Sequence, residues 1–318
     1  MEKIRYIILK FIRIIYRKLS KKTWYTEEYV QLFDQEANDY IKDKIKTSKN
    51  GLMLAKFGTY ELETMLYFLL DNHNFAASID MIKCHRSIFF TDIKKHLPNM
   101  GFFPTDEKYL EKFSKLYLND IKEIDILASY ICTEHYLSKE LQNVKKVNLE
   151  GYYAPFLWKN PWTYELKNKK VLVIHPFTDT IKSQYEKRKF LFKDENFLPD
   201  FKELLLLKSV QSIANNIPTE FSDWYEALDY MKSEIDKLDF DIALIGCGAY
   251  GLPLAAHIKR MNKIAIHTAG WTQILFGIYG ERWLEDEKYK GFINEHWVRP
   301  SENEKPKQFS TIEKGCYW

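Results

Sequence analysis

Cysteine is scarce in this sequence, with four residues among 318, and none belongs to a C-x-x-C pair or lies at zinc-finger spacing from a histidine. That pattern argues against a structural metal site and suits a reducing cytosol. An excess of one charge is also lacking, because 47 basic residues nearly balance 44 acidic ones. No global field therefore indicates a nucleic acid as partner. No internal repeat or low-complexity segment occurs, and 46% hydrophobic residues suffice for a buried core.

A long uninterrupted apolar run is missing too, even in residues 1–24, where apolar residues recur at helical spacing. Basic residues interrupt the run too often for a transmembrane span, and no small-residue cleavage site follows, as a signal peptide requires. Two interpretations remain: a cationic amphipathic helix on the inner face of a membrane, or an ordinary helix packed on the domain. We expect a cytoplasmic protein, peripheral on the membrane under the first interpretation.

Short apolar runs alternate with amphipathic segments along the rest of the chain. Strands are expected over residues 52–57, 124–130, 169–174, 204–207, 241–245 and 263–267, and helices over 26–46, 62–70, 178–192, 222–238 and 252–260. Residues 76–145 are expected to be mostly helical. The alternation predicts an α/β fold with a doubly wound, mostly parallel, Rossmann-like sheet.

We expect the helix of residues 1–24 to precede a single domain over 25–318. Its two halves are residues 25–165 and 166–318. Residues 151–162, rich in aromatic residues, are interpreted as a connector or as a loop covering the site. The aromatic residues Tyr317 and Trp318 are expected to pack against the body.

Residues 241–283 dominate the functional interpretation. A strand, a G-x-G-x-x-G loop, a helix and a second strand follow one another there, and Gly246, Gly248 and Gly251 are the glycines of the loop. Missing side chains let the backbone turn sharply, so that the amides near Tyr250 and the helix N-terminus face an anion, for which phosphate is the expected group. The alternative is that the glycines merely close a tight turn.

The end of the second strand argues against NAD as that ligand. A dinucleotide site places Asp or Glu there for the ribose hydroxyls, whereas this chain has His267. The segment that follows carries Gly270, Gln273 and Arg282 among aromatic rings, which suit a stacked base and a pyrophosphate. In the alternative interpretation its tryptophans are core residues.

A similar strand, loop and helix occur near the N-terminal end of the fold, where Lys56, Gly58, Thr59 and Glu61 lie in the turn. Two such turns on one parallel sheet are expected at the same carboxyl edge, where ligands bind in open α/β sheets. Further candidates for the site are the polar residues Asp125, Lys182, Gln184, Tyr185, Arg188 and His267.

The chain resembles the GT-D-fold glycosyltransferases of bacterial surface-polysaccharide and protein-glycosylation loci, and more closely a set of uncharacterised proteins encoded among capsule or O-antigen genes. The closer likeness spans most of residues 50–318. It is carried by segments 56–62, 171–177, 184–185, 246–257, 273–277, 282–283 and 316–318.

The resemblance implies transfer of a sugar from a nucleotide sugar, UDP- or GDP-linked, to a glycan or lipid-linked acceptor. In the family an Asp-x-Glu segment holds a divalent metal and the diphosphate. Here Glu61 keeps the glutamate, Gly58 keeps the first glycine, Lys56 replaces an arginine and Thr59 replaces the aspartate. Two ways of neutralising the diphosphate stay open. Glu61 can hold Mg²⁺ or Mn²⁺, or cationic side chains can stabilise the leaving diphosphate without a metal.

The acceptor hydroxyl needs a base, and His175 is the first candidate, because it ends a strand and titrates near neutrality. Glu61 is the second. For His175 the alternative is that its ring merely orders a turn. Two other function classes stay open: a Rossmann-type oxidoreductase or methyltransferase, and a non-catalytic assembly protein, which Thr59 in the aspartate position favours.

Overall fold

A computed structural model describes the chain except residues 1, 21–22, 71–73, 215 and 312–314. Its centre is a seven-stranded sheet in the order β3-β2-β1-β7-β6-β4-β5, in which every pairing is parallel. The strands are β1 Leu52–Lys56, β2 Ile126–Ala128, β3 Lys145–Val147, β4 Lys170–His175, β5 Glu203–Lys208, β6 Ile242–Ile245 and β7 Ile264–His267. The predicted doubly wound, Rossmann-like α/β fold is confirmed.

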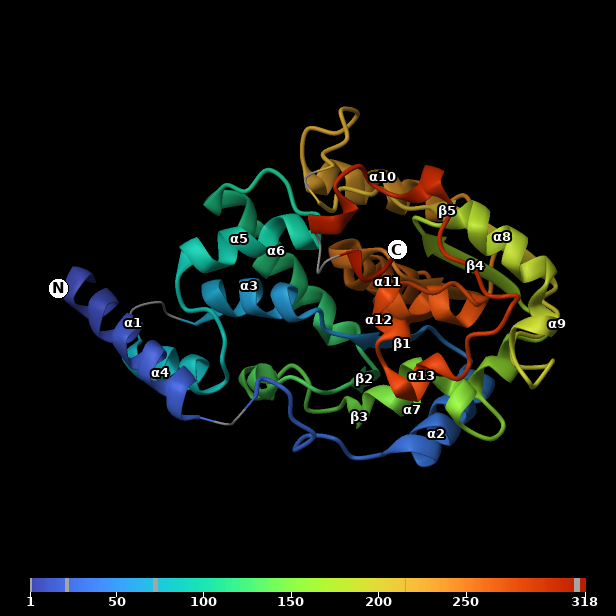
Figure 1. Ribbon diagram of the computed structural model, residues 1–318, viewed down its shortest axis with the longest axis horizontal. Coiled ribbons are helices and arrows are strands. Elements are labelled where there is room, and N and C mark those ends of the chain that lie inside the picture. Colours follow the sequence, from blue (N-terminus) through green and yellow to red (C-terminus); the bar gives the residue numbers. More distant parts are fainter. Residues whose placement is uncertain (1, 21–22, 71–73, 215, 312–314) are drawn as a thin grey trace.

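The inner strands are continuous apolar runs because helices cover both faces of the sheet. One core holds side chains of α3 Thr59–Leu69, α5 Phe90–Met100, α6 Glu107–Asp120, α10 Trp224–Ile235 and α11 Gly251–Arg260. The core on the opposite face holds side chains of α2 Asp34–Thr47, α7 Leu149–Tyr153, α8 Thr178–Glu186, α9 Arg188–Leu191, η6 Ala269–Phe276, α12 Glu281–Leu284 and α13 Glu287–Lys290. Figure 1 shows these helices on either side of the strands.

The remaining elements are α1 Glu2–Leu19, α4 Phe75–Lys83 and short 3-10 turns. These turns are η1 Ile121–Glu123, η2 Cys132–Leu137, η3 Pro155–Leu157, η4 Trp162–Leu166, η5 Gly248–Tyr250, η7 Glu302–Glu304 and η8 Phe309–Thr311. Helices α1 and α4 pack together at the end of the molecule opposite α8 and α9 (Figure 1). Among the residues described, no helix combines the length and the apolar character that crossing a membrane requires.

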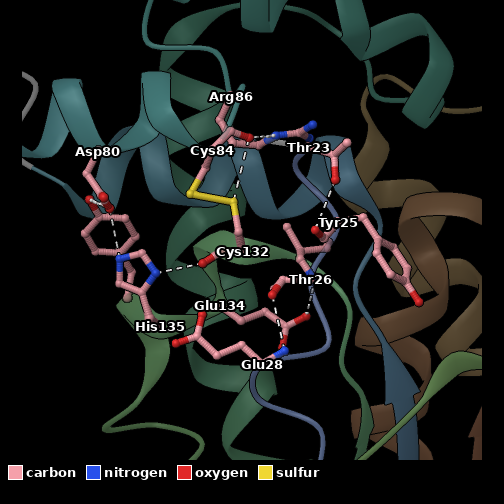
Figure 2. Close-up of a disulfide and its surroundings, with 12 residues drawn as sticks. Thr23, Tyr25, Thr26, Glu28, Asp80, Cys84, Arg86, Cys132, Glu134 and His135 are labelled. Atoms are coloured by element: carbon pink, nitrogen blue, oxygen red, sulfur yellow. Dashed lines mark hydrogen bonds and ion pairs between the residues drawn. A yellow bond between two sulfur atoms is a disulfide. The ribbon is translucent and has the colours of Figure 1, made fainter. Parts of the chain in front are cut away.

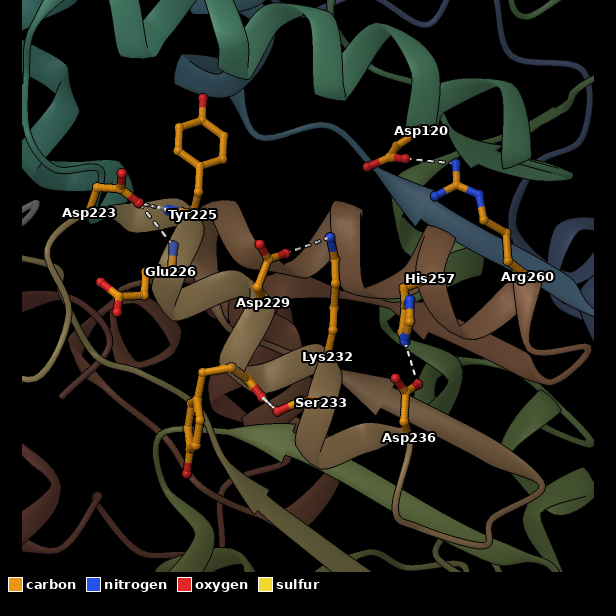
Figure 3. Close-up of polar contacts among 11 residues, drawn as sticks. Asp120, Asp223, Tyr225, Glu226, Asp229, Lys232, Ser233, Asp236, His257 and Arg260 are labelled. Carbon is orange, nitrogen blue, oxygen red and sulfur yellow. Dashed lines mark hydrogen bonds and ion pairs between the residues drawn. The ribbon is translucent and has the colours of Figure 1, made fainter.

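Polar contacts fix the helices around α11 (Figure 3). The side chain of Asp223 accepts two backbone N–H groups of the first turn of α10, both at 2.9 Å, and so caps that helix. Arg260 at the end of α11 pairs with the buried Asp120 of α6 at 2.7 Å. His257 of α11 lies 2.7 Å from Asp236 at the end of α10. The last two pairs join α11 to α6 and to the end of α10, and so help to fix the position of the glycine turn that precedes α11.

The helix expected to begin at Thr26 is wrong at its start, because α2 begins at Asp34. Residues 23–33 instead form a loop beside the sheet, with a turn at Glu28 and Tyr29. The Thr26 N–H donates to the Tyr130 carbonyl at 3.0 Å, and Leu32 makes an isolated parallel bridge to Val147. Backbone pairing with the sheet edge therefore outweighs the local preference of Thr26 for a helix N-cap.

Cys84 and Cys132 form a disulfide that links the end of α4 to η2 across 48 positions of sequence (Figure 2). The cysteine spacing does not predict this bond, because the two residues belong to no local motif. Cys247 is buried and free, and Cys316 is half-buried.

The expected packing of the C-terminal aromatic residues is confirmed. Trp318 is only 4% exposed. The ring of Tyr317 lies so close to Gly270 that a side chain there would meet it at 2.4 Å. The end of the chain therefore closes over the segment that follows β7.

Candidate functional site

A cavity of about 510 Å³ lies at the carboxyl edge of the sheet. The four adjacent central strands all end in its wall, with Lys56 at the end of β1, His267 at the end of β7, Gly246 directly after β6 and His175 at the end of β4. The connection after β4 enters a helix on one face, and the connection after β6 enters a helix on the other. Connections that diverge in this way open a crevice, which is where open α/β sheets bind ligands.

The two turns singled out in the sequence share this cavity. Residues Gly58 to Glu61 line it from β1, and Gly246, Cys247, Gly248 and Tyr250 line it from β6. Tyr117 of α6 links the two turns. Its hydroxyl donates to the Ala249 carbonyl at 2.5 Å. Burial raises the pKa of Tyr117, and the nearby charge of Glu61 adds to this increase. The expectation that both turns face one pocket is confirmed.

The three glycines of the G-x-G-x-x-G loop have different roles. A side chain at Gly246 would meet His175 and the Ala269 carbonyl, each at 2.6 Å, and one at Gly251 would meet the His267 ring at 2.3 Å. Both amides are also engaged, that of Gly246 with the Ile174 carbonyl at 2.9 Å and that of Gly251 with Gly248. Close packing therefore accounts for these two positions, and Gly251 does not line the cavity.

Gly248 is the glycine that leaves room for a ligand. It has a φ of +58°, and the nearest atom to an added side chain is the Met100 carbonyl oxygen at 3.6 Å. A backbone in this left-handed conformation favours glycine. Gly248 is exposed in the cavity wall, so a ligand can come close to the backbone of the loop at that residue.

His175 is buried, and its Nδ1 accepts the Phe177 N–H at 3.1 Å. This hydrogen bond assigns the ring hydrogen to Nε2. Burial lowers the pKa of His175 to about 3. The ring is thus neutral near pH 7, and neither nitrogen is available to take up a proton from an acceptor. Its ring orders the turn at Phe177, as the alternative interpretation holds, and a neutral ring of this tautomer suits donation from Nε2 better than base catalysis.

His267 is 4% exposed, and neither of its ring nitrogens has a hydrogen-bond partner among the residues described. Burial, helped by the charge of Lys56, lowers its pKa to about 3. The residue lines the cavity at the end of β7, where a dinucleotide site has a carboxylate.

Cationic side chains dominate the charge of the cavity wall. Lys56, Arg86 and Arg282 line it, whereas Glu61 is the single acidic side chain among the lining residues in the described part of the chain. Arg86 is 7% exposed and stacks over the Trp24 ring at 5.1 Å, while Lys56 lies over Tyr130 at 5.5 Å and Arg282 over Tyr317 at 4.5 Å. With neutral histidines, this wall favours an anion.

Glu61 occupies the third position of α3, and its carboxylate folds back towards the helix start. A side chain added at Gly58 would lie 1.9 Å from its Oε2. Thr59 lines the cavity beside it but supplies no carboxylate. No group of three or more His, Cys, Asp or Glu side chains suited to a metal ion occurs in the described ranges. The residues present fit a fully protein-held Mg²⁺ or Mn²⁺ site poorly.

Aromatic rings form much of the remaining wall. Tyr153 and Trp271 stack with centroids 3.7 Å apart at an angle of 14°, and both line the cavity. Tyr250 stacks on Trp224 at 4.9 Å, and its hydroxyl lies 3.0 Å from the Ser212 hydroxyl oxygen. The ring of Tyr250 is therefore fixed in the wall by its neighbours.

Gly270 and Gln273 also line the cavity, from the segment after β7. The Gln273 amide donates to the Tyr317 carbonyl at 3.1 Å and to the Ile278 carbonyl at 3.3 Å. Its main visible role is to hold the C-terminal residues, and close contact with Tyr317 explains Gly270.

Five further candidates lie outside the cavity wall: Asp125, Lys182, Gln184, Tyr185 and Arg188. Asp125 precedes β2 at the opposite edge of the sheet, where it accepts the Met53 N–H at 2.8 Å and pairs with Lys259 at 2.9 Å. A residue before a parallel strand lies at the amino edge, so its place in a strand-like run was misleading.

The candidates on α8 and α9 lie on helices packed on the opposite core instead. Gln184 is buried, and its amide donates to the carbonyls of Gly277 at 3.1 Å and His296 at 2.9 Å. The Tyr185 hydroxyl bonds Pro199 and Phe201, and Arg188 pairs with Asp200. Lys182 is exposed on the outer face of the helix. Lys182 and Arg188 were nominated as cations for the diphosphate, and Gln184 and Tyr185 as part of the family resemblance. Neither criterion distinguishes a helix that faces the cavity from one that faces away.

Arg86 is the most informative residue that the sequence does not single out. It follows α4 without any motif, and the tertiary fold alone brings it into the cavity wall. Figure 2 shows Arg86 close to the Cys84–Cys132 disulfide. Burial lowers its pKa from the ordinary value, and the carboxylate of Glu63 opposes that effect. Other unanticipated parts of the wall are Trp24, Asn99 to Gly101, Tyr117, Tyr130 and Ser209 to Ile213.

Comparisons of the chain with protein-family models, with curated proteins and with solved structures found no match.

Proposed function

We propose that this protein is a glycosyltransferase that binds a nucleoside-diphosphate sugar in the cavity and transfers the sugar to a glycan or lipid-linked acceptor. The observation that carries the proposal is the composition of the wall. Three cationic side chains, Lys56, Arg86 and Arg282, line a cavity at the carboxyl edge of a doubly wound sheet, and Glu61 is the one acidic side chain among the described residues that line it. A diphosphate needs such charge compensation.

The size and the rings of the cavity support the same ligand class. A volume of about 510 Å³ falls within the range of roughly 300–1,000 Å³ that small-molecule sites occupy. The stacked Tyr153 and Trp271 offer an aromatic surface for a base or a sugar. Gly248 supplies an open stretch of backbone near the start of α11, where an anion is favoured.

In the proposed reaction the acceptor oxygen forms a bond to the anomeric carbon while the bond to the diphosphate breaks. We assign the base to Glu61, the carboxylate of the wall. The acceptor proton goes to Glu61, and the negative charge of the departing diphosphate goes to the cationic side chains. His175, neutral and with its Nδ1 occupied, is assigned a hydrogen bond from Nε2 to the bound substrate.

A divalent ion is not required by this scheme. Glu61 would hold Mg²⁺ or Mn²⁺ only together with phosphate oxygens and water, and a bound ion would supply additional charge compensation for the diphosphate. Thr59 leaves no second carboxylate in that turn. The cations of the wall are therefore assigned the main share of the charge compensation.

The test is calorimetric titration of the protein with UDP, GDP and uridine. We expect a nucleoside diphosphate to bind and uridine to bind at least tenfold more weakly, because charge-assisted contacts to phosphate contribute roughly 1.5–3 kcal/mol each. Arg86→Gln should weaken nucleoside-diphosphate binding about tenfold or more. Arg188→Gln is the matched control, because Arg188 lies outside the cavity wall.

Catalysis is tested separately by release of sugar from the donor that binds. Glu61→Gln should leave binding largely intact and slow turnover about 100-fold or more, the usual range for losing a general base. Binding of NAD or of S-adenosylmethionine in place of nucleoside diphosphates would favour the oxidoreductase or methyltransferase class. Binding of none of these would favour a non-catalytic assembly protein.

A further inference from the structure

Helix α1 carries an apolar stripe that the rest of the described chain leaves uncovered. We propose that α1 docks this stripe onto the surface of an anionic lipid bilayer and lies in the membrane interface. The stripe is defined by the exposed residues Ile4, Ile7, Ile8, Phe11, Ile14, Ile15 and Leu19. Their spacing of three and four residues places them on one side of the helix.

The opposite side of α1 is fixed to the body of the protein. Leu9 is 3% exposed and packs with Ile82 and Phe89, and Ile12 and Tyr16 contact the same cluster. Arg5 donates to the Ser78 hydroxyl at 3.1 Å, and Arg13 pairs with Asp92. The helix is thus held from one side. The stripe faces solvent in this packing, with Phe11 at 63% and Ile4 and Ile7 at 65% exposed.

The charge of the helix identifies the occupant. Six basic residues and one acidic residue occur in α1. Two of the basic side chains, Arg5 and Arg13, are engaged with the body, whereas Lys10, Arg17 and Lys18 are exposed. An apolar stripe combined with exposed basic residues is the composition of interfacial helices that bind anionic lipid. Each basic residue near such a surface strengthens binding by about 1 kcal/mol, or about fivefold.

The lipid-facing helix adjoins a wall of the cavity. The Tyr16 ring lies 5.7 Å from the ring of His85, and the next residue, Arg86, lines the cavity with Trp24 stacked against it. Docking of the stripe would therefore bring that wall close to the bilayer. The membrane contact itself does not depend on the reaction in the cavity, so each can fail without the other.

The test is co-sedimentation of the full-length protein with phosphatidylcholine vesicles that contain or lack about one-third phosphatidylglycerol, without any nucleotide. We expect the protein to sediment with the anionic vesicles and to remain mostly in solution with the neutral ones. Phe11→Asp should reduce binding about tenfold or more, because a buried phenylalanine contributes about 1.5–3 kcal/mol. Phe190→Asp is the matched control, since Phe190 is 62% exposed on α9.

A second pair of variants isolates the charge. Neutralising Lys10, Arg17 and Lys18 together with glutamine should weaken binding to anionic vesicles about a hundredfold. The matched control neutralises Lys189, Lys193 and Lys202, which are exposed on α9, just after α9 and just before β5, and should change binding less than threefold.

Three outcomes would overturn the proposal. The wild type could stay in solution with both kinds of vesicle, or Phe11→Asp could bind as well as the wild type. Light scattering could instead show a dimer that Phe11→Asp dissociates, in which case the stripe is an interface between two copies of the chain. Circular dichroism of each variant verifies that the fold is retained.

Discussion

The two histidines at the carboxyl edge should make the protein lose stability as the pH falls. Burial lowers the pKa values of His175 and His267 from the ordinary 6.5 to about 3, with Lys56 contributing at His267. In the unfolded chain both rings take up a proton near pH 6.5. Below that pH the unfolded state therefore binds more protons than the folded state, and acid favours unfolding. The stabilisation is complete well above pH 6.5, begins to be lost as the pH falls through 6.5, and declines further towards pH 3.

The size of the effect follows from the pKa difference. One pKa unit corresponds to about 1.4 kcal/mol, so each histidine should cost about 2 kcal/mol of unfolding free energy between pH 6.5 and 5. Together His175 and His267 should cost about 4 kcal/mol at pH 5. That is a large part of the roughly 5–15 kcal/mol that holds a typical protein folded.

Urea unfolding at a series of pH values from 7.5 to 5 measures this dependence. The informative variant is His175→Asn, because an asparagine oxygen can still accept the Phe177 N–H that His175 Nδ1 accepts. Its unfolding free energy should fall about half as steeply as that of the wild type. His296→Asn is the control, because the side chain of His296 is 40% exposed and is therefore not a buried histidine. Equal slopes for His175→Asn and wild type would refute the reasoning.

Three further changes test the packing around the site. Gly246→Ala should cost about 3 kcal/mol in urea unfolding, since the new methyl group would meet three atoms within 2.7 Å, whereas Gly291→Ala, with nothing within 4 Å, should cost under about 0.5 kcal/mol. Replacing Cys84 and Cys132 with serine should lower the unfolding free energy by about 4 kcal/mol, because the unfolded chain is then no longer closed into a loop across 48 positions. Calorimetry can measure this loss of stability. Gln184→Met should lower the unfolding free energy by about 1–3 kcal/mol, because the buried carbonyls of Gly277 and His296 lose their hydrogen-bond donor. The affinity for UDP should stay unchanged, because Gln184 lies outside the cavity wall.

The elements that could be predicted are those whose information is local. The apolar runs that form β1, β4, β6 and β7 are buried on both faces, so their composition alone marks them as strands. The two turns after β1 and β6 could be assigned to one edge because parallel strands point the same way. The short β3 strand escaped detection because its Lys-Lys-Val sequence carries no such pattern.

The parts of the site that could not be predicted depend on contacts distant in sequence. Arg86 enters the wall from the end of α4, and Trp24 enters from the segment after α1, without any motif in either place. His175 was nominated as a base from its position at the end of a strand. Its protonation is decided by its burial and by the hydrogen bond from the Phe177 N–H, which only the folded structure shows. Polarity on α8 was equally uninformative, since the orientation of that helix is set by the opposite core.

The strand order also has a consequence for how the protein is made. Strand β7 is the last strand along the chain, yet it lies between β1 and β6 and pairs with both. During synthesis, β1, β2 and β3 leave the ribosome long before residue 264, and until then β1 presents an unpaired edge on that side. The nascent N-terminal half is therefore the species most exposed to aggregation, and a ribosome that stalls before β7 would leave a product that chaperones must hold.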